Sequence, residues 1–167
     1  MSFDIFRLKE IYEYKPETGD FIQKVRMSMR VKVGDVAGAK SKAGYIYLSI
    51  DRRRYLAHRL AWAYVYGEMP NMSIDHINRN KSDNRIENLR IATSIQNSWN
   101  RNETKRSSSG FKGVFWDGNT NKWIARICIN GKHKNLGRFQ AKEDARDAYV
   151  AFAKNAHGEF FCSEVAA

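Results

Sequence analysis

The chain has 167 residues, of which 43% are hydrophobic, and its 29 Lys and Arg against 18 Asp and Glu give a net charge of +11. This length suits one ordinary domain or two small ones, and no apolar run approaches the roughly 18 residues of a membrane span. The N-terminus lacks the layout of a signal peptide, so we expect a soluble, cytoplasmic protein. Cys128 and Cys162 lie far apart, outside any CxxC pair. We expect reduced, structural thiols rather than a disulfide framework or a zinc site of thiolates.

The positive charge is spread along the whole chain. Residues 1–100 carry 17 basic and 11 acidic side chains, and residues 101–167 carry 12 and 7. A single basic tail cannot produce this distribution. Such an excess favours a polyanionic partner, although charge alone also fits a basic, soluble surface.

The first third predicts short strands and turns, followed by a helix. The stretch "GYIYLSIDRRRYLAHRL" begins with the alternation of a β-hairpin, with "DRRR" at its tip. The spacing changes near Leu56 to that of a helix that ends at Gly67. This helix carries His58 and Arg59. His58 is either a packed helix residue or a contact to DNA phosphate or to a nearby site, and Arg59 is a candidate DNA contact.

The stretch "SIDHINRNKSDNRIENLRIATSIQNSWN", residues 73–100, predicts a compact ββα unit. "SIDHI" is a short strand, "NRNKSDNR" a polar loop, and "ENLRI" a second strand. Thr93 is a good N-cap for a helix that runs through Asn97 to about Asn102.

The polar residues of this unit suggest a chemical site. The carboxylate of Asp75 and the side-chain carbonyl of Asn97 offer hard oxygen ligands, which suit magnesium or manganese far better than zinc. His76 would point to the opposite side of a regular strand, so it is free to act as a base, with an ordinary pKa of about 6.5. Asn88 could accept the proton of the far ring nitrogen and so fix the tautomer of His76.

After "RNETKRSSSG", the remainder predicts a second small domain of three strands and a helix. "DGNTN" and "NGK" supply the turns between the strands, and "AKEDARDAYVAFAKNAHG" has the apolar face of a helix that packs on them. The basic segment before it is either a linker or a segment that follows the DNA backbone, with Arg101, Lys105 and Arg106 contacting phosphates. We expect a first domain over 1–102, with its ββα core at about 73–102, a linker over 103–108 and a second domain over 109–167.

Asp75-His76, Asn88 in "IENLR" and Asn97, in this order and spacing, resemble the HNH nucleases. They are most similar to the phage and intron-encoded homing type, in which asparagine replaces the last histidine of the motif. The resemblance spans roughly residues 44–102. It implies a ββα-metal site with one Mg²⁺ or Mn²⁺ ion on Asp75 and Asn97, His76 as general base and Asn88 orienting His76.

The third region resembles an AP2 domain, which lays a three-stranded sheet in the DNA major groove and also occurs attached to phage HNH nucleases. The matching segments are "SGFKGV", "KWIARI", "LGRF" and "EDARDAYVAFAKNAHGE". This chain departs from the plant pattern at Lys112, where arginine is expected, and at Asn135, where a tryptophan usually stands. The plant target sequence is therefore not carried over. Phe111, Trp123 and Phe139 are expected in the core. The outward candidates for DNA contact are Lys112, Trp116, Arg126, Cys128, His133 and Asn135.

Together these features predict an α+β protein that is a site-selective, nicking DNA endonuclease of the homing type, encoded by a phage and active in a bacterial host. The partner is double-stranded DNA, with no membrane, no small-molecule cofactor, and a monomer as the default state. The alternative is a DNA-binding regulator with a decayed HNH unit. RNA is disfavoured because the A-form major groove is too narrow for the sheet.

Overall fold

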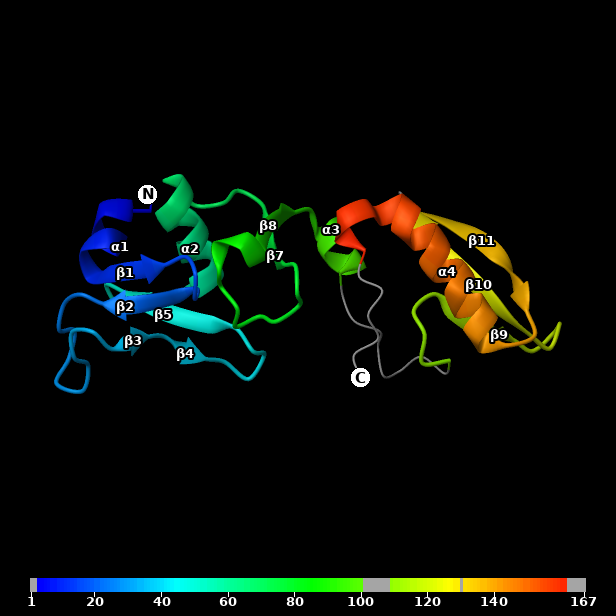
Figure 1. Cartoon of the computed structure of the whole chain (residues 1–167), viewed down its shortest axis with the longest axis horizontal. Helices are drawn as coiled ribbons and strands as arrows, with labels where there is room; N and C mark the ends of the chain where they lie inside the picture. The colour runs from blue at the N-terminus through cyan, green and yellow to red at the C-terminus, as the bar shows by residue number, and fades with distance from the viewer. Residues whose placement is uncertain (1–2, 101–108, 130, 162–167) are drawn as a thin grey trace. The chain divides into compact units, whose positions relative to one another are not determined.

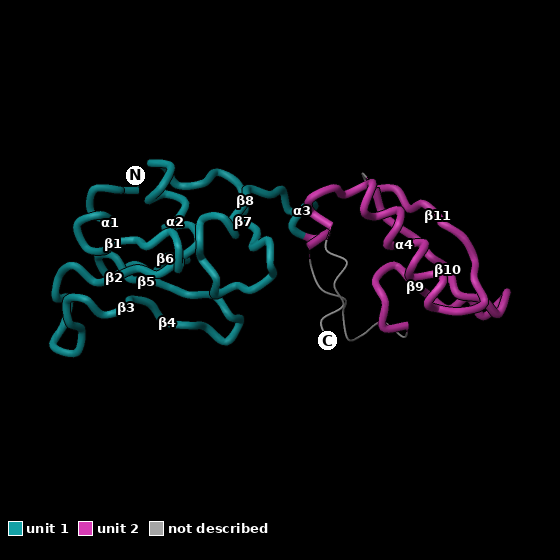
Figure 2. The backbone as a smooth tube through the Cα atoms, in the orientation of Figure 1, with its two compact units in different colours: residues 1–97 teal, residues 98–167 magenta. Residues whose placement is uncertain are grey.

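The computed structural model describes residues 3–100, 109–129 and 131–161. These residues form small antiparallel sheets and a few helices, which is a mixed α/β architecture (Figure 1). The chain divides into two compact units, residues 1–97 and 98–167 (Figure 2). Within the described residues, no helix is both long enough and apolar enough to cross a membrane.

Unit 1 begins with a short helix that the sequence did not predict. Helix α1 (Ile5–Ile11) starts at Asp4, whose carboxylate accepts a hydrogen bond from the backbone N–H of Arg7 at 3.0 Å. It buries Leu8 and Ile11 and continues directly into a strand. Seven residues are too few to show a clear helical period, which is why sequence reasoning placed only strands and turns here. The first sheet follows, with order β1-β2-β3: β1 (Tyr12–Lys15), β2 (Asp20–Gln23) and β3 (Val36–Ala37).

The second sheet contains the predicted hairpin. Its order is β4-β5-β6, with β4 (Ala39–Lys40), β5 (Ile46–Ile50) and β6 (Arg53–Leu56). The turn is tighter than "DRRR", because only Asp51 and Arg52 have positive φ, at 47° and 66°, while the next two arginines already belong to β6. Helix α2 (Ala57–Tyr66) follows at once. It ends as predicted at Gly67, whose left-handed φ of 82° lets its N–H reach the carbonyl of Ala63.

The predicted strand, loop, strand and helix are confirmed in residues 73–99. Strand β7 (Ser73–His76) pairs antiparallel with β8 (Leu89–Ala92), and the 3₁₀ turn η1 (Ile86–Asn88) precedes β8. Helix α3 (Ser94–Trp99) comes next. Its predicted cap is present, because the Thr93 hydroxyl accepts from the N–H of Gln96 at 3.1 Å and the Gln96 side chain accepts from the N–H of Thr93 at 2.8 Å.

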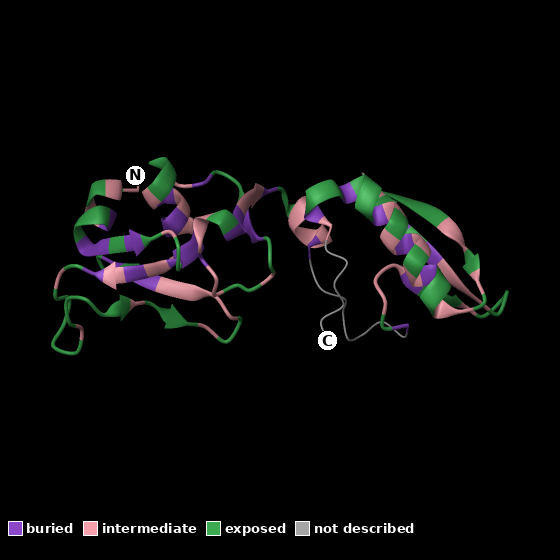
Figure 3. Cartoon of the chain, viewed as in Figure 1, coloured by how far each residue is buried: buried purple, intermediate pink, exposed green. Residues whose placement is uncertain are grey.

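One apolar core holds unit 1 together and supports the loop between β7 and β8 (Figure 3). The Tyr14 hydroxyl donates to the carbonyl of Asn84 in that loop at 2.7 Å. Gly19 lies against the same place, because a Cβ there would be 2.4 Å from the backbone nitrogen of Arg85. The turn between β1 and β2 therefore sets the position of the loop. The fully enclosed core residues are Leu8, Ile11, Phe21, Ala57, Leu60 and Ala61.

Unit 2 contains a sheet of order β11-β10-β9, made of β9 (Val114–Asp117), β10 (Lys122–Ile129) and β11 (Lys132–Phe139). Helix α4 (Lys142–His157) packs against all three strands, and the turn η2 (Gly158–Phe160) ends the described part. The core residues are Val114, Ala125, Ile127, Ala145, Tyr149 and Ala153. The predicted core positions of Phe111, Trp123 and Phe139 are confirmed, since all three pack against this cluster.

Strand alternation defines the face of this sheet that α4 does not cover. Ala125 and Ile127 are buried under α4, so Arg126 and Cys128 between them point the other way, and both are exposed. Their cross-strand partners are Asn135 and His133. We call this surface the open face. The expectation of a structural thiol is therefore wrong for Cys128, whereas the expectation that Cys128 points outward is confirmed. Cys162 lies outside the described residues.

Candidate functional site

Four polar side chains are buried in and around the β7–β8 hairpin. Asp75, His76, Asn84 and Asn88 are each between 3% and 5% exposed. Buried polar groups are costly unless they are hydrogen-bonded, so their partners determine what the site can do.

Asp75 is held by an arginine on the opposite strand. Arg90 is its cross-strand partner, and Nε and Nη2 of its guanidinium lie 2.9 and 2.7 Å from Oδ2 of the carboxylate. Both side chains are almost enclosed, with 5% and 12% of their surfaces exposed. This two-pronged pair fixes the orientation of the Asp75 carboxylate.

The imidazole of His76 is on the other side of β7 from Asp75, as the strand period predicts, and it meets an asparagine. Its Nε2 lies 3.3 Å from Oδ1 of Asn84. The Asn84 amide nitrogen donates to the carbonyl of Ser82 at 3.4 Å, so Oδ1 is the acceptor. This assigns the ring proton to Nε2 and leaves Nδ1 as the basic nitrogen. Burial lowers the pKa of His76, and the bond to Asn84 opposes this only in part. The ring is therefore neutral near pH 7.

Asn88 was predicted to accept the ring proton of His76, but its side chain bonds to the loop backbone instead. Its Oδ1 accepts from the backbone N–H of Asn78 at 2.9 Å, and its Nδ2 donates to the carbonyl of Asp83 at 2.8 Å. Asn88 thus ties together the two ends of the loop that follows His76. The ring contact predicted for Asn88 belongs to Asn84, because the Asn88 amide is used by the loop backbone.

A second imidazole packs against His76. The ring of His58, on α2, lies 5.0 Å from that of His76 at an angle of 83°, and the Tyr45 ring lies 5.5 Å from His58 and 6.1 Å from His76. Burial lowers the pKa of His58 to about 3, with smaller contributions from His76 and Arg59. His58 is therefore neutral and packed against the ring of His76.

Arg59 points its guanidinium at the backbone before β7. It donates to the carbonyls of Pro70, at 2.7 Å, and Met72, at 3.3 Å. This contact fixes the segment that leads into the site.

Asp75 and Asn97 are the residues predicted to offer oxygen ligands to a cation. Asn97 is half-buried on α3, which begins two residues after β8 ends. The described residues contain no cluster of three or more His, Cys, Asp or Glu side chains that could hold a metal ion. A magnesium-type ion needs no such cluster, because it binds through one or two protein oxygens with water and phosphate completing its shell. The donor set therefore fits such an ion and does not fit zinc.

In unit 2, the structure divides the predicted DNA contacts into two groups. Arg126, His133 and Asn135 lie on the open face, and the Arg126 guanidinium lies over the Phe115 ring at 5.1 Å. Trp116 pairs with Trp123 and packs edge-on against it at 5.1 Å, on the side that α4 covers.

Among the described residues, one further basic candidate, Lys112, has another role. The Lys112 ammonium donates to the carbonyls of Ser98 and Trp99, at 3.3 and 2.9 Å, so Lys112 caps the end of α3. Lys112 was predicted to point outward, and sequence alternation could not show this capping contact. Trp116, also predicted to point outward, is 48% exposed while its ring packs against Trp123. Arg101, Lys105 and Arg106 lie outside the described residues.

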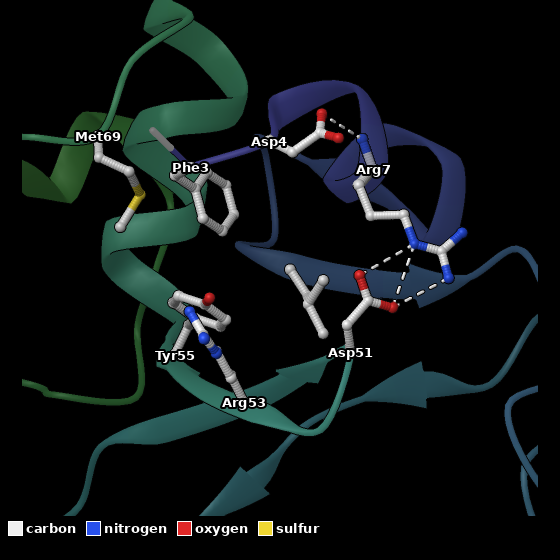
Figure 4. Close-up of a pocket in the computed structure, with 8 residues that line it drawn as sticks. Phe3, Asp4, Arg7, Asp51, Arg53, Tyr55 and Met69 are labelled. Atoms are coloured by element: carbon white, nitrogen blue, oxygen red, sulfur yellow. Dashed lines mark hydrogen bonds and ion pairs between the residues drawn. The ribbon is translucent and has the colours of Figure 1, made fainter. Parts of the chain in front are cut away.

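A separate hollow of about 630 Å³ opens between the start of α1 and the β5–β6 turn (Figure 4). Its carboxylates have structural uses. Asp4 caps α1, and Asp51 accepts a hydrogen bond from Arg7 at 3.0 Å. We assign no chemistry to this hollow.

Sequence reasoning missed Asn84 and Arg90. Arg90 could be found only from the register that places it opposite Asp75. Asn84 stands among several polar loop residues, and no spacing rule distinguishes it from its neighbours.

With this geometry in place, the chain can be compared with known proteins. Residues 55–99, from β6 to the end of α3, match the model of the HNH endonuclease family. It is 31% identical over 104 residues to Protein 3.8 of Escherichia phage T7, which covers 62% of this chain and 85% of that protein. It is 34% identical over 121 residues to an HNH endonuclease of Acanthamoeba polyphaga mimivirus, covering 71% of this chain and 62% of the viral protein. No solved structure matches the chain.

Proposed function

We propose that this protein is a metal-dependent DNA endonuclease that nicks one strand of a double-stranded target. The observation that carries the proposal is the state of His76: a buried, neutral imidazole whose Nε2 is bonded to Asn84 and whose Nδ1 is basic. A general base must be unprotonated and held in one orientation to remove a proton from water, and His76 meets both conditions.

In the proposed reaction, Nδ1 of His76 takes a proton from the water that attacks the phosphorus atom. The bond to the 3′-oxygen breaks, which leaves 5′-phosphate and 3′-hydroxyl ends. Asp75 and Asn97 would hold one Mg²⁺ or Mn²⁺ ion. When bound, the ion would supply positive charge to the scissile phosphate and to the leaving oxygen. Arg90 keeps the Asp75 carboxylate in place, and Asn88 keeps the loop after His76 closed.

Unit 2 is proposed to bind the DNA. Three antiparallel strands with a helix on one face leave the other face able to enter a B-form major groove, as the resemblance to AP2 domains implies. Arg126, His133 and Asn135 would then contact DNA. The homing type, a phage origin, action in the cytoplasm of a bacterial host and a monomeric state belong to this proposal. A monomer with one such site cuts one strand.

The test is cleavage of supercoiled plasmid carrying diverse phage DNA, with magnesium, with manganese and with chelator. We expect metal-dependent conversion to open circle by the wild type and a loss of roughly 10²- to 10⁴-fold in His76→Ala, because a general base contributes that much. Binding to the plasmid should be unchanged in the variant. Tight binding by the wild type without cutting under any metal would overturn the proposal and favour the DNA-binding regulator.

A further inference from the structure

The proposed reaction gives no role to the second buried imidazole of the site. His58 is 5% exposed and lies on α2, a different element from the hairpin that carries His76. Its ring meets the His76 ring nearly edge to face, at 5.0 Å and 83°. Such T-shaped pairs are the preferred geometry for aromatic rings in contact.

Folding alone does not explain a histidine at this position. Nδ1 of His58 is buried and has no hydrogen-bond partner among the described residues. An unpaired buried polar atom is destabilising, and an apolar side chain of similar size would fill the space without it. His58 destabilises the fold through its unpaired Nδ1 and yet lies against the proposed base, His76. This combination makes His58 a candidate for a functional role.

The bond to Asn84 is not the only contact that borders the His76 ring. The Nε2···Oδ1 distance is 3.3 Å, which is long for a hydrogen bond. His58 and Tyr45 border the same ring at different angles, 83° and 52°. Lys81, from the loop that follows His76, lies over the Tyr45 ring at 4.9 Å, which joins this aromatic group to the loop.

We propose that His58 is a positioning residue that holds the His76 imidazole in its productive orientation by edge-to-face packing of its own ring. The proposal rests on the function given above, because it takes His76 as the base. His58 touches neither substrate nor metal in this role. It restricts the rotation and the tautomer exchange of the His76 ring, which acts on the attacking water.

Two variants of His58 separate this role from simple filling of space. His58→Leu removes the ring, and His58→Phe keeps a ring edge without nitrogen. Both relieve the unpaired Nδ1, so we expect melting temperatures equal to or above that of the wild type. In steady-state nicking, we expect kcat to fall roughly ten- to hundredfold in the leucine variant at unchanged KM. A small misplacement of a reacting group costs this much in rate. The phenylalanine variant should stay within about threefold of the wild type.

The matched control is Tyr66→Leu, which removes an exposed aromatic ring from the end of the same helix. It should leave kcat unchanged. A leucine variant of His58 with wild-type kcat would overturn the proposal, and so would a phenylalanine variant as impaired as the leucine variant with its fold intact.

A second measurement does not depend on cleavage. In ¹⁵N-histidine NMR of the metal-free protein, we expect wild-type His76 to show one tautomer, protonated at Nε2, and His58→Leu to show both tautomers in exchange. An unchanged His76 spectrum in that variant would overturn the positioning role. If the wild type fails to nick DNA, the proposed nuclease function is lost, but this spectrum still decides whether His58 orients His76.

Discussion

The two units of this chain place their candidate functional residues differently. In unit 1 these residues are enclosed: Asp75, His76, Asn84 and Asn88 are buried, and so is His58, which packs against His76. Unit 2 also buries Asn100, Ser109 and His157, but its candidate DNA contacts Arg126, His133 and Asn135 are exposed on the open face.

This difference follows from what each unit is proposed to do. A group that must abstract a proton or fix an ion works best when it is desolvated and held by its neighbours, which requires a buried polar network. A surface that meets a charged duplex must stay hydrated and exposed until the partner arrives. The comparison predicts that substitutions of the buried polar residues at the hairpin of unit 1 will damage stability far more than substitutions of exposed polar residues in unit 2.

The largest expected effect is on the buried ion pair. Arg90→Met removes the partner of an enclosed carboxylate, and leaving one buried charge unpaired costs roughly 3–5 kcal/mol. We expect the free energy of unfolding of unit 1 to fall by this amount, measured by denaturant titration with hydrogen exchange to separate the units. Magnesium should restore part of the loss, because a cation would neutralise Asp75.

The matched control is Arg138→Met in unit 2. Arg138 pairs with Asp117 at 3.3 Å, but the arginine side chain is 49% exposed. Exposed pairs contribute little, so we expect no change that the same titration resolves. Equal losses in the two variants would contradict the distinction between the units.

The next effect is the acid sensitivity of unit 1. The folded pKa of His58, about 3, lies below the roughly 6.5 of an unfolded histidine, so the unfolded chain takes up a proton first as pH falls. The contribution of neutral His58 is complete above about pH 6.5 and is lost as pH falls toward 3. At pH 5 the loss is about 2 kcal/mol.

This loss is measured as the difference in unfolding free energy between pH 7 and pH 5. The variant His58→Phe should lack this share of the decrease, while the contributions of the other histidines remain. An identical decrease in wild type and variant would show that His58 is not held neutral by the fold.

A smaller effect separates the two asparagines of the hairpin. Asn84→Ala removes the acceptor of the Nε2 proton of His76, so we expect roughly a tenfold loss of kcat at unchanged KM, together with a lower melting temperature because that buried N–H loses a partner. Asn88→Ala leaves backbone groups of the loop unpaired, so it should lower the melting temperature with a smaller loss of kcat. Asn80→Ala, in the same loop, is the control and should keep wild-type kcat. A larger loss of kcat in Asn88→Ala than in Asn84→Ala would reverse the assignment.

The hairpin was predictable because its signals are local. The short apolar run around the polar pair of "SIDHI", the polar loop and the Thr93 cap each depend on a few neighbouring residues, and the structure contains the strand, the loop and the cap. The same holds for the β5–β6 hairpin and for α2, where Gly67 ends the helix. Local rules therefore located the elements that carry the site.

The partners inside the site were not predictable in the same way. Which asparagine reaches the His76 ring depends on how the loop closes, and that closure is set partly by Tyr14 and Gly19, about 60 to 70 residues earlier in the chain. Arg90 pairs with Asp75 because of register, and Lys112 turns away from the open face to cap α3. These contacts are tertiary, so residue spacing alone could not distinguish them from their alternatives.

The smallest expected effect concerns the face of unit 2 that meets DNA. Arg126 lies on the open face, over the ring of Phe115, whereas Trp116 packs with Trp123 on the side of α4. If the open face contacts DNA, Arg126→Ala should weaken binding a fewfold and reduce the slope of log K against log salt by about 1, because one fewer phosphate is neutralised. Trp116→Ala should leave that slope unchanged, even if it loosens the unit. Binding of the full chain to a fixed duplex, measured at several salt concentrations, decides between them. A slope that changes with Trp116 and not with Arg126 would place the DNA against the other side of the sheet.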